Sequence, residues 1–130
     1  MKFTRIKETC LYVQDLDRTQ HFYQEVLGFD LISRAEKRHV FFRVGHSVLL
    51  CFLPEATSSD KHLPPHYALG KIHLAFECPE KDYEQWKVKL QQKDIAITHE
   101  HHWWGEQWSF YFEDPDGHVL EVVKPGLWGD

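Results

Sequence analysis

Residues 110–123 read FYFEDPDGHVLEVV, and this stretch decides the fold. Two apolar, β-prone runs flank the short polar insert EDPDGH, a pattern typical of a strand, a tight turn and a second strand. Pro115 suits the first central position of a turn, and Gly117 supplies the freedom in φ that the exit of the turn requires. Glu121 is the exception, because it places a lone carboxylate inside the apolar run VLEVV. The stretch predicts a β-hairpin whose last strand carries an unexplained acidic residue.

Length and composition narrow the class of protein. A chain of 130 residues with 42% apolar and 15% aromatic residues can bury a core as one domain or as two small repeats. A net charge of −5 without a Lys/Arg run argues against nucleic acid and anionic membrane partners. No apolar run approaches the roughly 20 residues that span a bilayer, and the first residues lack the apolar core of a signal peptide. Because the three cysteines form no CxxC pair, we expect buried, reduced thiols in a cytoplasmic protein.

The order of the predicted elements is the same in the two halves of the chain. The first half, residues 4–53, begins with a strand at 6–13 and continues with a helix at 19–27, capped by Asp15 or Asp17 and ended by Gly28. Three strand-like runs follow, FDLIS, HVFFRV and SVLLCFL. Residues 54–70 contain three prolines and small polar residues, which predicts a linker.

Residues 71–124 repeat this order, and residues 125–130 form a short tail. The strand KIHLAFEC precedes a helix at 82–90 and the strands DIAIT, WSFYFE and HVLEVV. The sequence therefore predicts an α+β fold of two tandem βαβββ modules, forming a curved mixed sheet around a central cavity.

Superposition of the two halves brings three polar residues to matching places. An offset of 65 residues lays Glu8 over His73 in the first strand of each module. An offset of 72 residues lays Leu49 over Glu121 in the last strand of each module. Two modules related by pseudo-symmetry would bring such positions together around one axis. The overlay predicts that Glu8, His73 and Glu121 face one cavity, with an apolar fourth corner.

Each of these residues also has a simpler interpretation. Glu8 alone suits a solvated strand residue, and His73 alone suits a hydrogen-bonded core histidine. Glu121 must be exposed, paired or bound to a cation, because burial of an unpaired carboxylate costs several kcal/mol. Together, one imidazole and two carboxylates suit a divalent ion, Zn, Ni, Mn, Co or Fe, with coordination positions left open for a substrate.

Alternation along the strands adds candidate substrate contacts. Cys10 and Tyr12 share a strand face with Glu8, and Ser109 and Tyr111 share one in the strand before Glu121. Trp104 lies in the aromatic stretch 101–108, which we interpret as a loop forming a lid or pocket wall around a small ligand. A hydrophobic plug at the interface between repeats or subunits is the alternative interpretation of that stretch.

Three stretches of the chain carry motifs of a known family: LYVQDLDRTQHFYQEVLGFDL at 11–31, HLAFEC at 73–78 and SFYFEDPDGHVLEVV at 109–123. They resemble the vicinal oxygen chelate superfamily, which includes glyoxalase I, fosfomycin-modifying transferases, extradiol dioxygenases and metal-free bleomycin-binding proteins. The resemblance implies paired βαβββ modules around a metal and, in small members, usually a homodimer. The family's ligand positions fall on Glu8, where histidine is common, His73 and Glu121. The fourth ligand of glyoxalase I falls on Leu49 or Leu50.

The resemblance favours a divalent-metal enzyme that acts on a small oxygen-bearing organic substrate, with Glu121 or Glu8 as a candidate base. A glyoxalase-like lyase or isomerase, a transferase and a dioxygenase all fit this description. The alternatives are a metal-free, bleomycin-resistance-like binding protein and a purely structural domain. The tryptophan-rich stretch and the incomplete ligand set speak for the metal-free protein.

Overall fold

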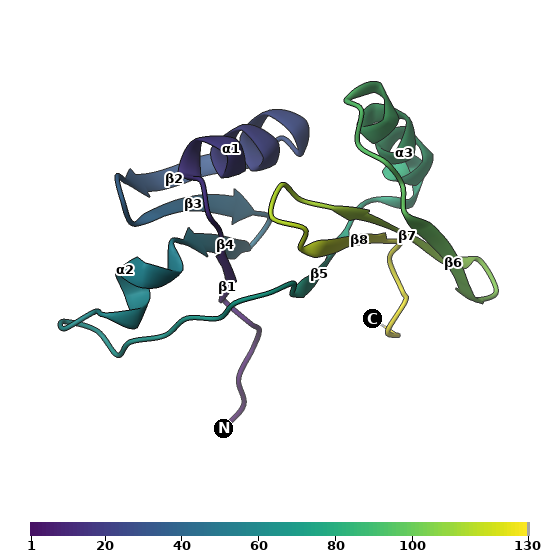
Figure 1. Cartoon of the computed structure of the whole chain (residues 1–130). Helices are drawn as coiled ribbons and strands as arrows, with labels where there is room; N and C mark the ends of the chain where they lie inside the picture. Colours follow the sequence, from purple (N-terminus) through teal and green to yellow (C-terminus); the bar gives the residue numbers. More distant parts are fainter. Residues whose placement is uncertain (130) are drawn as a thin grey trace. The chain divides into compact units, whose positions relative to one another are not determined.

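The computed structural model describes residues 1–129 of the chain. It divides into two compact units, Met1–Gly70 and Lys71–Asp130, and each unit has its own four-stranded mixed sheet. The order β-α-β-β-β occurs once in each unit (Figure 1), so the α+β fold of tandem βαβββ modules is confirmed. Among residues 1–129, no helix combines the length and the apolar character needed to cross a membrane.

The first unit builds a sheet from β1 (Glu8–Tyr12), β2 (Asp30–Ala35), β3 (His39–Val44) and β4 (Ser47–Phe52), in the order β1-β4-β3-β2. Strands β1 and β4 are parallel, and the other neighbours are antiparallel. One face packs against α1 (Leu16–Gln20) and the π-helix η1 (His21–Val26). Tyr23 of η1 is fully buried, and its ring lies 5.6 Å from that of Phe42 in β3. Alternate strand residues therefore face either this core or the side of the sheet away from α1.

The start of α1 is fixed by a side-chain cap. Asp15 has extended backbone angles, and its Oδ1 accepts a hydrogen bond from the Arg18 amide at 3.0 Å. The helical segment ends before Gly28, whose φ of +76° is the conformation that favours glycine. We expect Asp15→Ala to lower the free energy of unfolding by about 1 kcal/mol, because an orphan helix amide loses its acceptor. Chemical denaturation measures this loss, and Asp15→Ser should restore most of it; equal stability of the Ala and wild-type proteins would contradict the cap.

The second unit repeats the arrangement with β5 (His73–Glu77), β6 (His99–Trp104), β7 (Gln107–Glu113) and β8 (Val119–Val123), in the order β5-β8-β7-β6. A 3-10 turn, η2 (Glu80–Asp82), leads into α3 (Tyr83–Gln92). The rings of Tyr83 and Phe110 lie 5.2 Å apart and both side chains are buried, which places α3 on the Phe110 face of the sheet. The opposite face is called the helix-distal face of the second sheet below.

The predicted turn between β7 and β8 is present. The Gly117 amide donates to the Asp114 carbonyl at 2.9 Å, and Gly117 has a φ of +82°. The Asp114 carboxylate accepts from the amides of Asp116 and His118 at 3.0 and 2.8 Å. Pro115 thus occupies the first central position, and the hairpin prediction from EDPDGH is confirmed.

Two local predictions are wrong. Residues 94–98, DIAIT, form no strand, because Asp94 adopts a φ of +59° and the Ile95 amide still bonds back to the Leu90 carbonyl at 2.9 Å. The second wrong prediction is the loop at 101–108. The strand starts at His99, so most of this aromatic stretch lies in β6 and β7, which are joined by a tight turn at Gly105.

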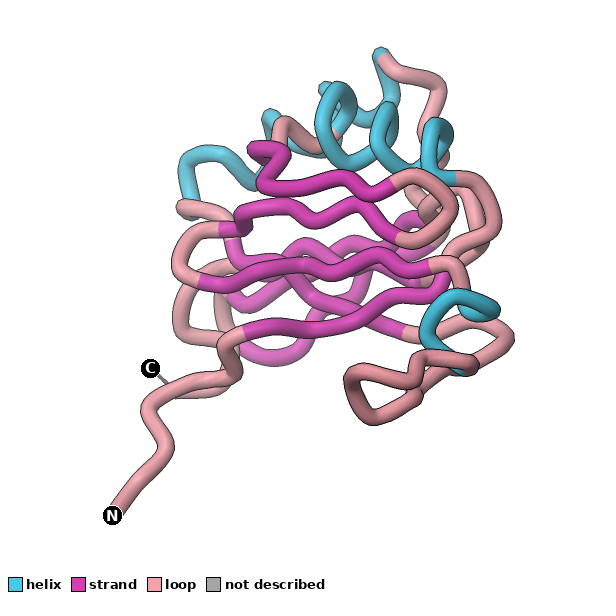
Figure 2. The backbone as a smooth tube through the Cα atoms, turned by 90° about the vertical axis from the view of Figure 1, so that its left-hand side faces the viewer, coloured by secondary structure: helices cyan, strands magenta, loops and turns pink. Residues whose placement is uncertain are grey.

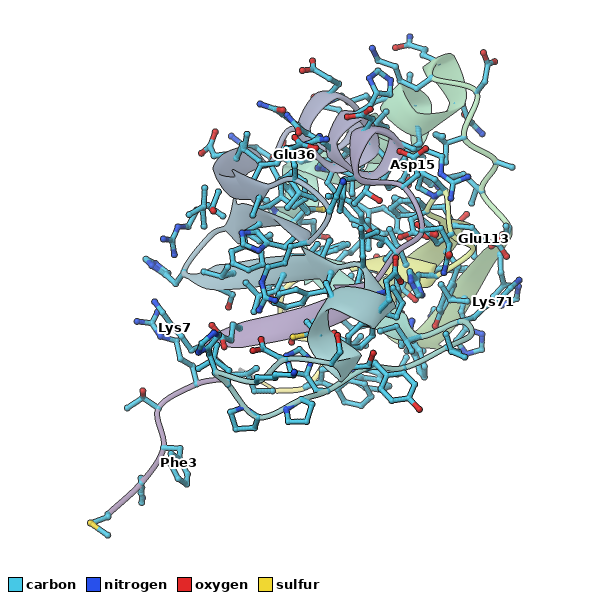
Figure 3. The ribbon with its side chains drawn as sticks, turned by 60° about the vertical axis from the view of Figure 1, so that its left-hand side comes forward. Phe3, Lys7, Asp15, Glu36, Lys71 and Glu113 are labelled. Atoms are coloured by element: carbon cyan, nitrogen blue, oxygen red, sulfur yellow. The ribbon has the colours of Figure 1, made fainter. Side chains whose placement is uncertain are left out.

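The segments outside the two sheets are short. Within residues 54–70, the short helix α2 (Pro54–Ser58) precedes an irregular segment in which the His66 amide bonds to the Thr57 carbonyl. Residues 1–7 extend from β1 without regular structure (Figure 2), and the Phe3 side chain is exposed (Figure 3). At the start of the second unit, Lys71 pairs with Glu113 of β7 at 3.3 Å, which ties the segment before β5 to the sheet.

Candidate metal centre

His73 and Glu121 form a contact pair on the helix-distal face of the second sheet. β5 and β8 are parallel neighbours, and their register sets His73 opposite Val119, two residues before Glu121. His73 Nε2 lies 3.2 Å from Glu121 Oε2. The Glu121 side chain is only 6% exposed, whereas the His73 side chain is 51% exposed. The glutamate is therefore the buried member of the pair, and the histidine offers access from solvent.

The orientation of the His73 ring is fixed by the backbone. Its Nδ1 lies 2.9 Å from the Val119 carbonyl oxygen, which can only accept, so Nδ1 carries the proton. The second nitrogen, Nε2, points to Glu121. This is the arrangement of metal-binding histidines, in which an outer carbonyl holds one ring nitrogen and leaves the other for the ion.

The Glu121 carboxylate ends a directed chain of hydrogen bonds. The Trp103 indole donates to Ser109 Oγ at 2.9 Å, and Ser109 and Glu121 both hydrogen-bond to the Tyr111 side chain. Burial and the bond to Glu121 raise the pKa of the Tyr111 phenol and outweigh the opposite effect of Ser109. Tyr111 therefore keeps its proton at neutral pH and presents a neutral hydroxyl beside the pair.

One oxygen of the Glu121 carboxylate has no hydrogen-bond donor within residues 1–129. Oε1 is buried and accepts no hydrogen bond from the residues that the structure describes. A buried carboxylate oxygen without a partner is costly, so its place in the native protein needs a donor or a cation. The separation of 3.2 Å between Nε2 and Oε2 is what two adjacent ligands present to one ion at about 2.0–2.2 Å each. The donor set and its spacing fit a divalent metal.

Within neither unit do the described residues gather three His, Cys, Asp or Glu side chains around one point. The second unit thus offers two protein ligands, one nitrogen and one oxygen. Glu8, the third ligand expected from the sequence, lies in the first unit, where it is exposed on the face of β1 away from α1. Glu8 as a ligand stays a prediction.

The strand register corrects the sequence overlay at the position of the first sheet that matches Glu121. Glu8 stands opposite Val48, as His73 stands opposite Val119. Two residues further along β4, Leu50 therefore occupies the place that Glu121 occupies in β8. The prediction of Leu49 at this place is wrong, because Leu49 faces the α1 core and is buried there.

The two other expected contacts from β1 lie beside Glu8. Cys10 is partly buried, and burial together with the Glu8 charge raises the pKa of its thiol. Burial and the neighbouring Cys10 raise the pKa of Tyr12, whose hydroxyl lies 2.6 Å from His66 Nδ1. The two groups share a hydrogen bond that ties β1 to the segment after α2. The sequence interpretation missed His66, since it stands in the stretch read as a linker.

Trp104 and Trp103 both lie at the end of β6. A register shift between His102 and Trp104 sets Trp104 opposite Gln107, on the same side as Ser109. Trp104 is 50% exposed, and its ring is 6.3 Å from that of Trp128. Ser109 is fully buried and accepts a hydrogen bond from the Trp103 indole at 2.9 Å, and its role as a substrate contact stays a prediction. Ser109 therefore supports the Trp103 and Tyr111 side chains from below.

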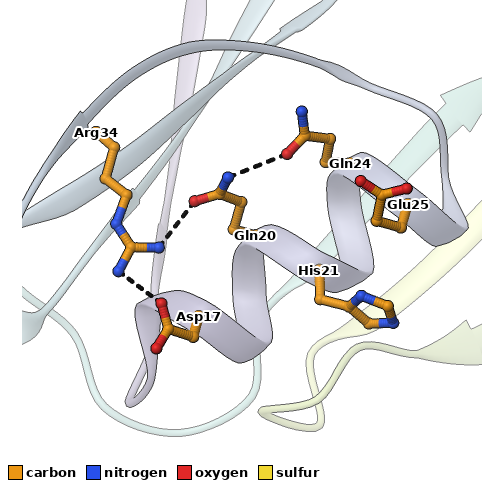
Figure 4. Close-up of a pocket in the computed structure, with 6 residues that line it drawn as sticks. All are labelled: Asp17, Gln20, His21, Gln24, Glu25 and Arg34. Atoms are coloured by element: carbon orange, nitrogen blue, oxygen red, sulfur yellow. Dashed lines mark hydrogen bonds and ion pairs between the residues drawn. The ribbon is translucent and has the colours of Figure 1, made fainter.

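A polar depression on the first unit lies along α1 and η1 (Figure 4). Arg34 of β2 crosses it and bonds to Asp17 at 2.7 Å and Gln20 at 2.8 Å, with Glu36 as a further partner at 2.7 Å. Hydrogen bonds to Glu36 and Asp17 raise the pKa of the Arg34 guanidinium further. The Arg34 guanidinium is thus already engaged by carboxylates and is not free to bind an anion. Its lining residues are Asp17, Gln20, His21, Gln24, Glu25 and Arg34.

Comparison with known proteins identifies the family. A family model described as Glyoxalase/Bleomycin resistance protein/Dioxygenase superfamily matches residues 5–122. A metallothiol transferase FosB of Staphylococcus epidermidis is 27% identical over 94% of this chain and 82% of its own. A glutathione transferase FosA of Serratia marcescens is 32% identical over 90% of this chain and 78% of its own.

A solved structure supports the same conclusion. The structure described as lactoylglutathione lyase from Agrobacterium tumefaciens superposes with a TM-score of 0.95 at 32% identity, over the full length of both chains. The three relatives are named as enzymes, two transferases and a lyase. The chain belongs to the glyoxalase/bleomycin resistance protein/dioxygenase superfamily.

Proposed function

We propose that this protein is a divalent-metal-dependent enzyme that acts on a small organic substrate with neighbouring oxygen atoms. The observation that carries the proposal is the pair of His73 Nε2 and Glu121 Oε2 at 3.2 Å, with Nδ1 held by a carbonyl and Oε1 left without a partner. His73 and Glu121 would hold the ion, and Glu8 is the third ligand expected from the sequence. A bound divalent ion supplies Lewis-acid stabilisation of negative charge that develops on substrate oxygens.

The other groups of the second unit suggest how the substrate is held. Tyr111 keeps its proton and can donate a hydrogen bond to a substrate oxygen near the pair. The exposed Trp104 ring offers a flat apolar surface for the rest of a small molecule. In the first unit, Cys10 and Tyr12 lie on the same strand face as Glu8 and remain proposed substrate contacts.

A reaction that removes a proton from the substrate requires a base. Glu121 is the candidate in the second unit, because it is buried and lies next to both Tyr111 and His73. Glu8 is the candidate in the first unit, where solvent reaches it. A small-molecule substrate, a homodimer and a cytoplasmic location complete the proposal. The metal-free alternative is not favoured, because the relatives are named as a metallothiol transferase, a glutathione transferase and a lyase.

Metal binding is the direct test. Purified protein is stripped with chelator, dialysed against Ni(II), Mn(II), Zn(II) or Fe(II), and analysed for bound metal. We expect His73→Ala to bind the preferred ion more weakly by over 100-fold, since loss of an outer-shell partner alone costs about 10–100-fold. Glu113→Gln, a glutamate exposed in the neighbouring strand, is the matched control and should bind like wild type.

Two results would contradict the proposal. The first is equal binding by the His73→Ala and wild-type proteins. The second is no binding by wild type at any of the four ions. A panel of small oxygen-bearing substrates, tested with the ion that binds, then identifies the reaction.

A further inference from the structure

We propose a second metal site, formed by His99 and His101 on β6. The two residues are separated by one position in a strand, so both side chains lie on the helix-distal face of the second sheet. His99 Nε2 lies 3.5 Å from His101 Nδ1. The site goes beyond the proposed function, because it needs neither His73 nor Glu121.

The distance between the two nitrogens is long for a hydrogen bond and close to the separation of two ligands of one ion. Two neutral imidazoles can share one proton between nitrogens, but 3.5 Å lies beyond the usual range of about 2.7–3.2 Å for such bonds. Two nitrogens that bind one tetrahedral ion at about 2.0–2.1 Å each stand about 3.3–3.4 Å apart. The rings already hold nearly that separation, so an ion could bind with little movement of the protein.

The strand holds the pair in a place that an ion can reach. β6 is the edge strand of its sheet, and both histidines are exposed. On the inner side, His99 stands opposite Tyr111 with its ring 5.8 Å from the phenol ring, and His101 stands opposite Ser109. The neighbouring β7 therefore backs both imidazoles, which restricts their rotation and favours a fixed ligand geometry.

The ligand type sets the class of ion. Imidazole nitrogens suit Cu(II), Ni(II) and Zn(II), and the Irving–Williams order puts Cu(II) first among these. Since the described residues provide no third His, Cys, Asp or Glu at this point, water would fill the remaining positions. The Tyr111 ring separates this site from the first, because it lies 5.8 Å from His99 and 6.1 Å from His73. A second ion would thus add positive charge on the far side of Tyr111.

The same strand supplies a reporter and a matched control. The Trp103 ring lies 4.6 Å from the His101 ring, so Cu(II) bound there should quench tryptophan fluorescence. His102 has the same chemistry but points to the other side of β6. Its Nε2 lies 2.8 Å from the Gly105 carbonyl, and its ring packs on Trp108 at 4.5 Å. If single histidines bound the ion nonspecifically, replacement of His99, His101 or His102 would weaken binding equally. If His99 and His101 chelate the ion, only their replacement weakens binding.

The experiment uses the full chain with Glu121→Gln as background, so that binding at the first site does not contribute. Cu(II) is titrated while tryptophan fluorescence is recorded, and Zn(II) binding is measured by calorimetry. We expect His99→Ala and His101→Ala each to weaken binding on the order of 100-fold, since the second ligand of a linked pair acts at high effective concentration. His102→Ala should bind as the background does.

Equal affinity in the His99→Ala, His101→Ala and His102→Ala proteins would overturn the second site. Absence of quenching and of heat in the Glu121→Gln protein would overturn it as well. Neither result bears on the first site, which is measured by the His73→Ala comparison. Conversely, normal Cu(II) binding at His99 and His101 with no ion bound by His73 would retain the second site and reject the proposed function.

Discussion

Replacement of Glu121 by leucine is expected to stabilise the metal-free protein while it removes one ligand of the proposed metal site. Glu121 is 6% exposed and keeps one oxygen without a partner, so desolvation of the carboxylate costs more than its contacts return. Apolar substitution of such buried charges often adds about 1–4 kcal/mol. Leucine also stands at the matching register place of the first sheet, Leu50. We therefore expect the free energy of unfolding to rise by about 1–4 kcal/mol in Glu121→Leu without metal.

Addition of the preferred ion should reverse this order of stability. The wild-type protein gains about 2.7 kcal/mol at an ion concentration of 100 Kd, and Glu121→Leu gains little because it lacks a ligand. Urea denaturation with chelator and with ion measures both values. Glu113→Leu is the control, since its carboxylate is 46% exposed and should give a small change in either condition. A large loss of stability in metal-free Glu121→Leu would show that the carboxylate supports the fold. That result would contradict the idea that the Glu121 carboxylate serves as a metal ligand at a cost in stability.

Phe110→Ala is expected to cost about 3–5 kcal/mol of the free energy of unfolding. Phe110 is fully buried between the second sheet and α3, with its ring 5.2 Å from Tyr83 and 6.1 Å from Phe112. Truncation removes the ring and leaves a cavity at the contact that holds α3 on its sheet. Thermal or urea denaturation followed by circular dichroism measures the loss.

The loss of stability should depend on whether the replaced residue of β7 is buried or exposed. Glu113→Ala in the same strand removes only an exposed ion pair with Lys71 and should change stability by less than about 1 kcal/mol. A loss of similar size in both variants would mean that α3 is not held by the Phe110 contact. Full loss of folding in Phe110→Ala is resolved with Phe110→Leu, which keeps much of the buried volume and should lose less.

The hairpin at 110–123 could be predicted because its signals are local. Pro115 and Gly117 each have one strong backbone preference, and the structure uses both in the turn. Period-2 alternation also predicted that Ser109 and Tyr111 share a strand face, and the β7–β8 ladder sets Tyr111 opposite Glu121. The pairing of His73 with Glu121 followed from the repeat, because parallel first and last strands carry matching places in each module.

The features that were missed depend on tertiary contacts. Residues 94–98 are as β-prone as a strand, but the β6–β7 ladder begins only at His99. Strand β6 is formed by HEHHWW, which carries no apolar alternation. That edge strand exists because its backbone pairs with β7, which sequence preference does not show. The spacing of His99 and His101 was visible, yet it acquires meaning only once both residues are known to lie in a strand. Likewise, the overlay of the two halves laid Leu49 over Glu121 because it aligned turn positions instead of strand registers.

The parallel pairs β1–β4 and β5–β8 also shape how this chain folds. Every strand pairing in residues 1–129 joins strands of the same unit. The longest loops to be closed run from Glu8 to Val48 and from His73 to Val119, which are partners across these pairs. Closure entropy grows only slowly with loop length, but non-local pairs form late and limit the rate. Because β4 and β8 each form a local hairpin with the strand before them, we expect the pairing of the first strand with the last to be the slow step in each half. In the second half, that step brings His73 to Glu121.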